Sequence, residues 1–173
     1  MEARYGASRL ATLRNRGGSG ETARFGGVIF TRADAEGIRR LKDLHGRSFM
    51  AVDPDSLGGW LMGLRLLRAS GVEPREDFAG LRFGGTHDAV VRAVASGAVA
   101  AGTVRTDTLE RMAAEGRIDP GTFRILHPAD APGFPFRVST RLYPEWPFAR
   151  LPGADPALAR RGAVALLDMP AHS

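Results

Sequence analysis

The chain has 173 residues, 43% of them hydrophobic, with no cysteine and a formal net charge of +5. These values predict a globular protein with one domain or two small lobes, exclude disulfides and thiol chemistry, and leave no apolar run of the roughly 20 residues that a membrane-spanning helix needs. The basic charge is almost all arginine and clusters only at Arg39-Arg40 and Arg160-Arg161, on patterns of helical period, so we expect no nucleic-acid partner.

The first 45 residues predict extended segments followed by a short helix. Met1 is followed by EARYGASRL rather than by a basic and apolar leader, so we expect no export signal in this chain. The segments SRLATL and FGGVIFT are expected to be extended, with the loose loop RNRGGSGETAR between them. The segment EGIRRLKDLHG then predicts a short helix.

Strands and helices alternate, with short links, from Gly46 to Leu126. Buried strands are predicted at residues 47–52, 80–83, 98–104 and 122–126, and the segments between them have helical period with one apolar face. This alternation predicts an α/β fold with a parallel sheet, right-handed crossovers and helices on both faces of the sheet.

The end of the chain differs from this α/β unit. A Pro-rich segment follows Leu126, and Asp155-Pro156 then marks the start of a last helix by a cap and a first-turn proline. We therefore expect residues 46–126 to form one lobe that is inserted into another, which is made of residues 1–45 and 127–173 and includes the hinge segments. In that arrangement the first strand and the last helix pack together.

Each of the first three strands of this unit runs into a polar junction before its helix. The carboxyl ends of parallel strands lie at one sheet edge, where ligands of open α/β sheets bind. Each junction places a hydroxyl residue at or near a helix N-terminus, where free N–H groups and the helix dipole favour an anion. The junction residues are Asp53 to Gly59, with Ser56, Leu57 and Gly58; Gly84 to Asp88, with Thr86 and His87; and Arg105, Thr106 and Asp107.

Each junction also has an ordinary structural explanation. Ser56, Thr86 and Thr106 are typical N-cap residues in the absence of any ligand. A histidine such as His87 is more often a surface residue near a cap, and Arg105-Thr106-Asp107 could hold a simple salt bridge. Only the shared location of the junctions at one sheet edge favours a binding site.

Enzyme motifs are absent from the sequence. It contains no P-loop, no Gly-x-Ser-x-Gly and no His-Glu-x-x-His. The four histidines are far apart and lack metal-ligand spacing, so we expect no metal, no cofactor and no catalytic residue. A triad of Ser56, His87 and Asp107 can be drawn, and a hydrolase or transferase that uses Ser56 and His87 stays open as an alternative.

Three segments resemble a known family: VDPDSLGGWLM, GGTHDAVVRAVASGAVAAGTVRTDTLERM and STRLYPEWPFARLP. They are similar to the phosphate/phosphonate-type (PhnD-like) substrate-binding proteins of ABC transporters, which have the type 2 periplasmic-binding fold. The segments YPEWPFA and FGGVIFTRAD resemble more closely the branch that forms the sensor region of bacterial histidine kinases, including tetrathionate sensors. The resemblance covers almost the whole chain and implies binding of a small anionic ligand, without chemistry, in a cleft that closes between two lobes.

The resemblance also implies roles for the junction residues. In the phosphonate-binding members, hydroxyls and amides at the first helix N-terminus hold the oxyanion, and Ser56, Leu57 and Gly58 match that stretch. A histidine at the start of the second helix contacts the same group, and His87 matches it. An acidic residue at the third junction helps to bind the other end of the ligand, and Asp107 matches it in position.

Two features depart from the family pattern. A further acidic residue of that pattern falls where this chain has Trp146, with Glu145 beside it, which argues against an aminophosphonate-like ligand with a cationic end. The match also begins partway through the first lobe, at MEARYGASRLATL. We therefore expect a complete second lobe with a parallel-rich sheet and flanking helices, and an incomplete first lobe.

The leading hypothesis is a solute-binding or sensor domain for a small oxyanion, such as a phosphonate, a phosphate-like ion or a sulfur oxyanion. Its partners would be an ABC permease or the transmembrane and kinase region of a histidine kinase, and its location would be periplasmic or extracytoplasmic. A stand-alone ABC-transporter binding component is the alternative within the family. An incomplete first lobe would leave unpaired strand edges, which favours a homodimer.

Overall fold

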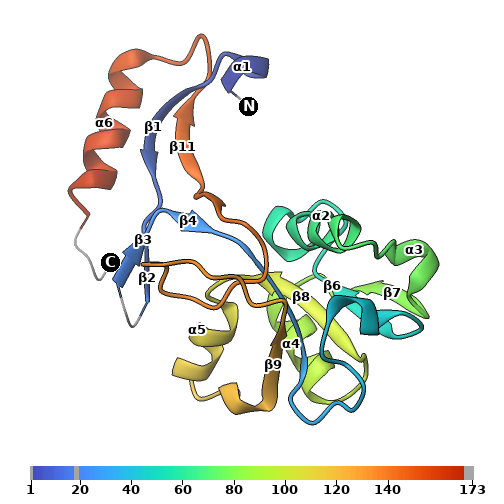
Figure 1. Cartoon of the computed structure of the whole chain (residues 1–173). Helices are drawn as coiled ribbons and strands as arrows, with labels where there is room; N and C mark the ends of the chain where they lie inside the picture. The colour runs from blue at the N-terminus through green and yellow to red at the C-terminus, as the bar shows by residue number, and fades with distance from the viewer. Residues whose placement is uncertain (1, 18–19, 170–173) are drawn as a thin grey trace.

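The computed structural model describes residues 2–17 and 20–169, and its centre is a five-stranded sheet. β6 pairs in parallel with β7 and β8, whereas β5 is antiparallel to both of its neighbours, β8 and β9. The strand order β7-β6-β8-β5-β9 corresponds to Gly80–Phe83, Ser48–Ala51, Ala101–Arg105, Gly27–Arg32 and Phe123–Leu126. We call residues 27–126, which contain this sheet and its helices, the sheet body (Figure 1).

The antiparallel β5 corrects the expected parallel sheet. The strands predicted at residues 47–52, 80–83 and 98–104 do form a parallel set, but β5 separates the last of them from β9. Val28, Ile29, Phe30 and Thr31 are all at most 1% exposed, so this strand is stable only where both of its faces are covered. The expected lobe boundary at residue 46 is corrected for the same reason, because β5 lies inside this sheet.

Helices cover both faces of the sheet, as the sequence predicts. Two buried hydrophobic clusters lie on opposite faces of the sheet. Side chains of β5 alternate between them, since Ile29 belongs to one cluster and Val28 and Phe30 to the other. The first face is covered by η1 (Leu41–Leu44), η2 (Leu57–Leu61), α2 (Met62–Ala69) and α3 (Pro74–Asp77), and the second by α4 (His87–Ala95) and α5 (Thr108–Ala114). The short η3 (Pro120–Thr122) precedes β9.

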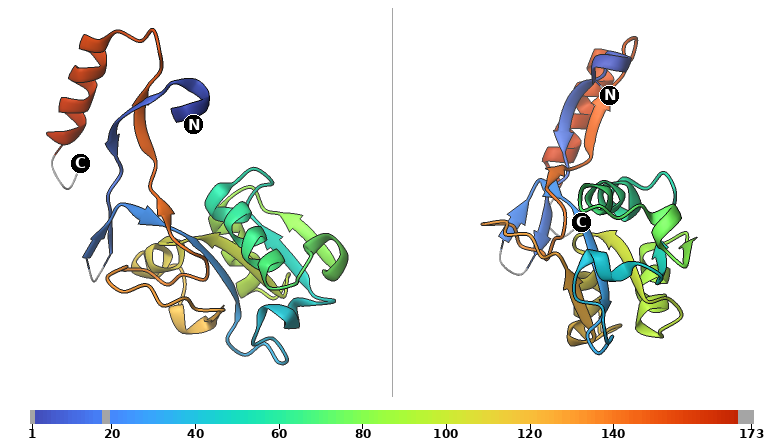
Figure 2. Two further views of the ribbon diagram at one scale, coloured as in Figure 1. Left: turned by 45° about the horizontal axis from the view of Figure 1, so that its top comes forward. Right: turned by 45° about the vertical axis from the view of Figure 1, so that its right-hand side comes forward.

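The two ends of the chain form an arm that stands beside the sheet body (Figure 2). We define the arm as β1 (Ser8–Thr12), β11 (Pro147–Arg150) and α6 (Pro156–Leu167). β1 pairs with β11 in antiparallel fashion and contacts α6, which confirms that the first strand and the last helix belong together. Asp155 caps α6 by accepting a hydrogen bond from the Ala157 amide at 2.8 Å, as predicted.

The segment expected to be a loose loop is a hairpin. β2 (Asn15–Gly17) pairs with β3 (Gly20–Thr22), and exposed Arg16 and Glu21 form an ion pair across it at 2.8 Å. Both faces of this hairpin are largely polar, so the sequence carries no alternation that would predict it. The short α1 (Glu2–Tyr5) precedes β1.

Two short strands connect the arm to the sheet body. β4 (Arg24–Phe25) leads into β5, and β10 (Tyr143–Pro144) leads into β11; the two pair with each other in antiparallel fashion. We call β4 and β10 the connecting strands. None of the helices formed by the described residues has the length and apolar character needed to span a lipid bilayer.

Candidate functional site

The first junction folds as a tight turn from β6 into η2. Ser56 is the N-cap of η2, and its Oγ accepts a hydrogen bond from the Gly59 amide at 3.1 Å. A Cβ at Gly59 would lie 2.5 Å from the Val52 side chain, so only glycine fits there. The amides of Leu57 and Gly58 donate to no acceptor in the described part of the chain. The junction therefore caps its helix and leaves two first-turn N–H groups without an acceptor among the described residues, one at exposed Leu57 and one at buried Gly58.

The second junction is bonded through its glycines to the end of β6, just before the first junction. The amides of Gly84 and Gly85 donate to the carbonyls of Ala51 and Val52 at 2.9 and 2.8 Å. Gly85 has φ 76°, a left-handed conformation that favours glycine. Thr86 follows as the N-cap of α4, and its hydroxyl accepts a hydrogen bond from the first turn of that helix at 3.2 Å.

His87, the first residue of α4, faces the third junction. Its Nδ1 accepts a hydrogen bond from the Arg105 amide at 3.3 Å, which assigns the ring proton to Nε2. Burial and the nearby Arg105 charge lower the pKa of His87, so its ring is neutral at pH 7. A neutral imidazole in this tautomer offers one N–H donor without a positive charge.

Thr106 and Asp107 follow β8 in different environments. Thr106 is 1% exposed, its Oγ1 accepts from the Gly26 amide at 3.1 Å, and its own amide donates to the Gly26 carbonyl at 2.9 Å. Thr106 therefore lies next to the N-cap of α5, as expected, but its hydroxyl bonds to Gly26 rather than to the first turn of that helix. Asp107 is the N-cap of α5, but its carboxylate makes no capping hydrogen bond and its backbone is left-handed, with φ 78°. Burial raises the pKa of Asp107.

Arg105, the last residue of β8, joins the three junctions. Besides the bond from its amide to His87, it packs directly on the first junction, because a Cβ at Gly58 would lie 2.8 Å from the Arg105 Cβ. Its Nε lies 3.4 Å from Asp107 Oδ1, and its Nη2 lies 2.5 Å from Glu145 Oε1. The guanidinium side chain is still 18% exposed. The three junctions thus converge, as expected, with an arginine at the meeting point.

The Pro-rich return segment brings Glu145 and Trp146 to the same place. Glu145 is 2% exposed and accepts hydrogen bonds from Arg105 Nη2, from Asn15 Nδ2 and, at 3.0 Å, from the Trp146 amide. Trp146 is 52% exposed, and its ring stacks on Phe25 with the centroids 6.1 Å apart. The Arg105 guanidinium lies 4.8 Å from the centroid of the same Phe25 ring.

Asn15 and Phe25 are site neighbours that sequence reasoning missed. They come from β2 and β4, in the stretch that was expected to be a loop and the start of an extended segment. Neither residue has a spacing that relates it to the junctions. The aromatic residue at the start of FGGVIFT was the only available signal, and it does not by itself indicate a binding site.

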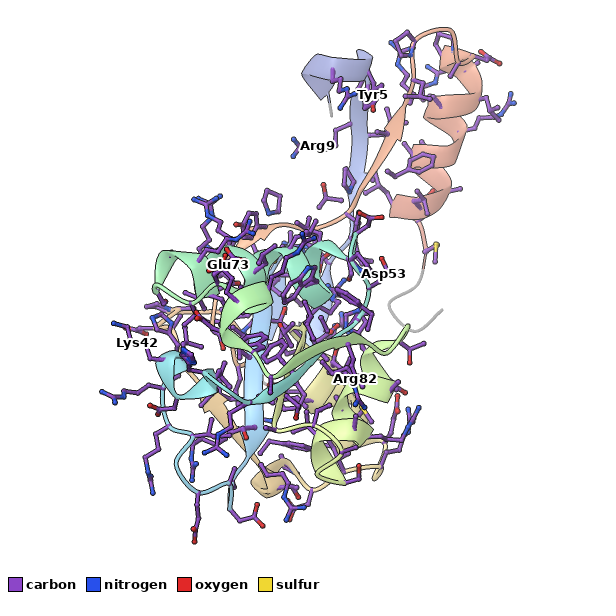
Figure 3. The ribbon with its side chains drawn as sticks, turned by 90° about the vertical axis from the view of Figure 1, so that its right-hand side faces the viewer. Tyr5, Arg9, Lys42, Asp53, Glu73 and Arg82 are labelled. Atoms are coloured by element: carbon purple, nitrogen blue, oxygen red, sulfur yellow. The ribbon has the colours of Figure 1, made fainter. Side chains whose placement is uncertain are left out.

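A cavity of about 690 Å³ lies between the arm and the β2-β3 hairpin, next to the site. Its lining includes Trp146, Phe148 and Leu166 but not Ser56, His87 or Arg105. Figure 3 shows Asp53, at the end of β6, on the side of the sheet body that faces the arm, and Lys42 on the side away from it. Among residues 2–17 and 20–169, no three histidine, aspartate or glutamate side chains are grouped to hold a metal ion.

Comparisons with solved structures show the fold. A protein of Xanthomonas citri solved with ATP has a TM-score of 0.66 and 24% identity, covering 93% of this chain and 56% of its own. A binding-protein component of an ABC phosphonate transporter from Pseudomonas aeruginosa has a TM-score of 0.63 and 18% identity, covering 88% of this chain and 47% of its own. The expected type 2 periplasmic-binding fold is thereby confirmed, and this chain spans about half the length of those structures.

Comparisons of sequence show the family. The chain is 41% identical over 164 residues to the tetrathionate sensor histidine kinase TtrS of Salmonella typhimurium, which covers 94% of this chain and 27% of that kinase. The family model described as "ABC transporter, phosphonate, periplasmic substrate-binding protein" matches residues 1–173. Members of that family are binding proteins rather than enzymes. The chain therefore belongs to the periplasmic substrate-binding proteins of the ABC-transporter phosphonate family.

Proposed function

We propose that this chain is the ligand-binding region of an extracytoplasmic sensor and that it binds a small oxyanion where the three junctions meet. The observation that carries the proposal is the position of Arg105, which contacts the first junction at Gly58, the second at His87 and the third at Asp107. Arg105 contacts the three strand ends with its Cβ, its backbone amide and its guanidinium respectively, which places one charged donor group at their meeting point. Such a group is what a compact anion with several oxygens requires.

The proposed anion contacts are directed N–H groups from separate elements. The amides of Leu57 and Gly58 lie in the first turn of η2, where the helix dipole also favours negative charge. The Nε2–H of His87 adds a neutral donor, and the exposed part of the Arg105 guanidinium adds a charged one. Ser56 fixes the first turn as its cap, so its contribution is to orient these amides.

The net charge of Arg105, Asp107 and Glu145 bears on how the anion is bound. Arg105 faces the two carboxylates of Asp107 and Glu145, so the cluster has a formal charge of −1 when both are ionised. Binding must therefore depend on the geometry of the donors, because net charge alone does not attract the ligand. Burial raises the pKa of Asp107, so a lower pH reduces the negative charge of the cluster. We propose a tetrahedral or sulfur-containing oxyanion, and the tetrathionate named in the similar kinase is the first candidate.

We propose a sensor rather than a transport component because of the 41% identity to a sensor histidine kinase. In this proposal cleft closure is transmitted to a transmembrane and kinase region, and a permease is the partner in the alternative. Association of two copies stays a prediction, which the exposed apolar residues of α6 support. Thr86 and Thr106 have structural roles in this proposal, as a helix cap and as a bridge to Gly26.

A hydrolase or transferase that uses Ser56 and His87 has less support. The Ser56 hydroxyl accepts from Gly59, and the His87 ring accepts from the Arg105 amide. No hydrogen bond joins Ser56 to His87, both of which belong to the described residues. A serine nucleophile needs a base within hydrogen-bond reach, so this pair does not favour catalysis.

Calorimetry on the intact protein tests the proposal. The titrants are phosphate, methylphosphonate, sulfate, thiosulfate and tetrathionate, each against the parent and against the variant Ser56→Ala/His87→Ala. We expect one of these anions to bind and the double variant to weaken its binding at least tenfold. If no anion binds, or if the double variant binds equally well, the proposal is wrong. Turnover of a titrant would favour the enzyme alternative.

A further inference from the structure

Glu145 lies where the arm and the sheet body are joined. It directly follows β10, one of the two connecting strands, and its amide donates to the Ala23 carbonyl, directly before β4, at 2.8 Å. β4 and β10 are held together by the pairs Tyr143 with Phe25 and Pro144 with Arg24. Any rotation of the arm against the sheet body must pass through these strands (Figure 1).

The Glu145 carboxylate is buried and fully satisfied. Its side chain is 0% exposed, with Oε1 accepting from Arg105 and Asn15 and Oε2 accepting from the Trp146 amide. A buried carboxylate is costly unless charged or polar partners replace water. Its partners come from the end of β8, from the β2-β3 hairpin and from its own segment, so the charge is compensated only while these three parts keep their arrangement.

The same contacts fix the Arg105 guanidinium. Glu145 holds Nη2, Asp107 lies near Nε, and Phe25 covers one face of the guanidinium. Arginine has five donors in a rigid fork, and these contacts leave Nη1 without a partner among the described residues. Glu145 therefore determines where the free donors of Arg105 point.

We propose that Glu145 is the positioning residue of the anion site: it orients Arg105 toward the ligand and transmits ligand binding to the connecting strands. This inference rests on the proposed anion-binding function and assigns Glu145 a role without direct ligand contact. In this proposal the ligand contacts the Arg105 guanidinium, and the guanidinium is paired with Glu145, the residue next to β10. Occupancy of the site and the angle between arm and sheet body are then coupled through one ion pair.

Trp146 provides a spectroscopic readout of this coupling. Its amide is bonded to Glu145, and its exposed ring stacks on the Phe25 ring that also carries the Arg105 guanidinium. Trp60, the other tryptophan of this chain, is 5% exposed in the core. We expect the bound anion to change the fluorescence of the intact protein, with the change retained in Trp60→Phe and lost in Trp146→Phe.

The test compares Glu145→Gln with the parent in the intact protein, by calorimetry with the anion that binds the parent and by fluorescence at saturating anion. We expect about tenfold weaker binding and loss of the Trp146 signal, with an unchanged circular dichroism spectrum. Glu73→Gln is the matched control, because it removes the same charge from the surface of the sheet body, where Glu73 pairs with Arg68 at 2.7 Å. We expect that control to change affinity less than twofold. Asn15→Ala removes one donor and no charge, and should weaken binding about threefold.

The outcomes separate this inference from the proposed function. If the parent binds no anion, the proposed function fails, and this inference fails with it. If the parent binds and Glu145→Gln binds equally or more tightly, Glu145 acts only as a repelling charge and the positioning role is wrong. If Glu145→Gln does not fold, Asn15→Ala decides in its place, and unchanged affinity with an unchanged Trp146 signal in that variant overturns the inference.

Discussion

The sheet body and the arm use the same kinds of apolar residue in opposite ways. Phe30, Phe49 and Leu67 in the sheet body are 0% exposed, and the helices there pack on both faces of a five-stranded sheet. In the arm, α6 has no buried residue, and Leu158 and Leu167 are 60% and 74% exposed. A helix needs a wide apolar surface to bury its stripe, and a two-stranded ribbon is too narrow to provide it. The sheet body therefore supplies the stability, and the arm supplies surface.

The largest test of this contrast is a pair of Phe→Ala variants. Phe49 stacks on Phe78 in the core with the centroids 4.8 Å apart, whereas Phe148 of the arm is 44% exposed. Phe49→Ala should lower the free energy of unfolding by about 3–5 kcal/mol, and Phe148→Ala by less than about 1 kcal/mol. Urea unfolding followed by circular dichroism measures both. Equal losses would show that the arm is as well packed as the sheet body.

The next test concerns Arg105, where the two regions meet. Arg105→Lys keeps the charge beside Glu145 but loses the planar fork, so anion affinity should fall about tenfold, or about 1.4 kcal/mol. Calorimetry at constant ionic strength measures the change. Arg68→Lys is the control, since Arg68 pairs with Glu73 on the surface of the sheet body. A loss of the same size in the control would argue against a specific role for Arg105.

Anion affinity at this site, where the arm and the sheet body meet, should depend on pH. Burial holds the pKa of Asp107 above its ordinary value and the pKa of His87 below its own. Protonation of either group makes the cluster more positive, so anion affinity should rise as the pH is lowered from 8 toward 5.

The matching variant is Asp107→Asn, which should bind about threefold more tightly at pH 7 and keep only the part of the pH dependence that comes from His87. The charged neighbours of Asp107 are Arg105, Arg111, Glu110 and Glu145, and all of them are kept in this variant. Calorimetry at several pH values checks the slope. Weaker binding in Asp107→Asn would instead mean that this carboxylate contacts the ligand.

The smallest expected effect is in the arm. Leu167→Ser replaces an exposed apolar side chain, so the free energy of unfolding should change by less than about 0.5 kcal/mol. If two copies associate through the arm, the same variant should reduce the dimer fraction in sedimentation velocity. A dimer fraction that does not change would place any self-association elsewhere.

Prediction from sequence succeeded where local patterns decide the outcome. The strand Gly80–Phe83 and the caps Thr86 and Asp155 lie where expected, because hydrophobic period and capping chemistry are properties of neighbouring residues. The hairpin β2-β3 was not predicted, because it is polar on both faces. The antiparallel direction of β5 was not predicted, because the apolar pattern of a buried strand is the same for a parallel and an antiparallel strand.

The sequence by itself determined the α/β alternation, the polar strand ends and the family. Only the tertiary structure decided which polar groups meet: Thr106 turned inward to Gly26, and Arg105 was joined to Glu145, 40 residues away in the chain. Local spacing carries no information about such pairs, because a buried ion pair is selected by the geometry of two distant segments and by the cost of leaving either charge unpaired. The strand ends were therefore predictable as a location, and the arginine at their centre was not.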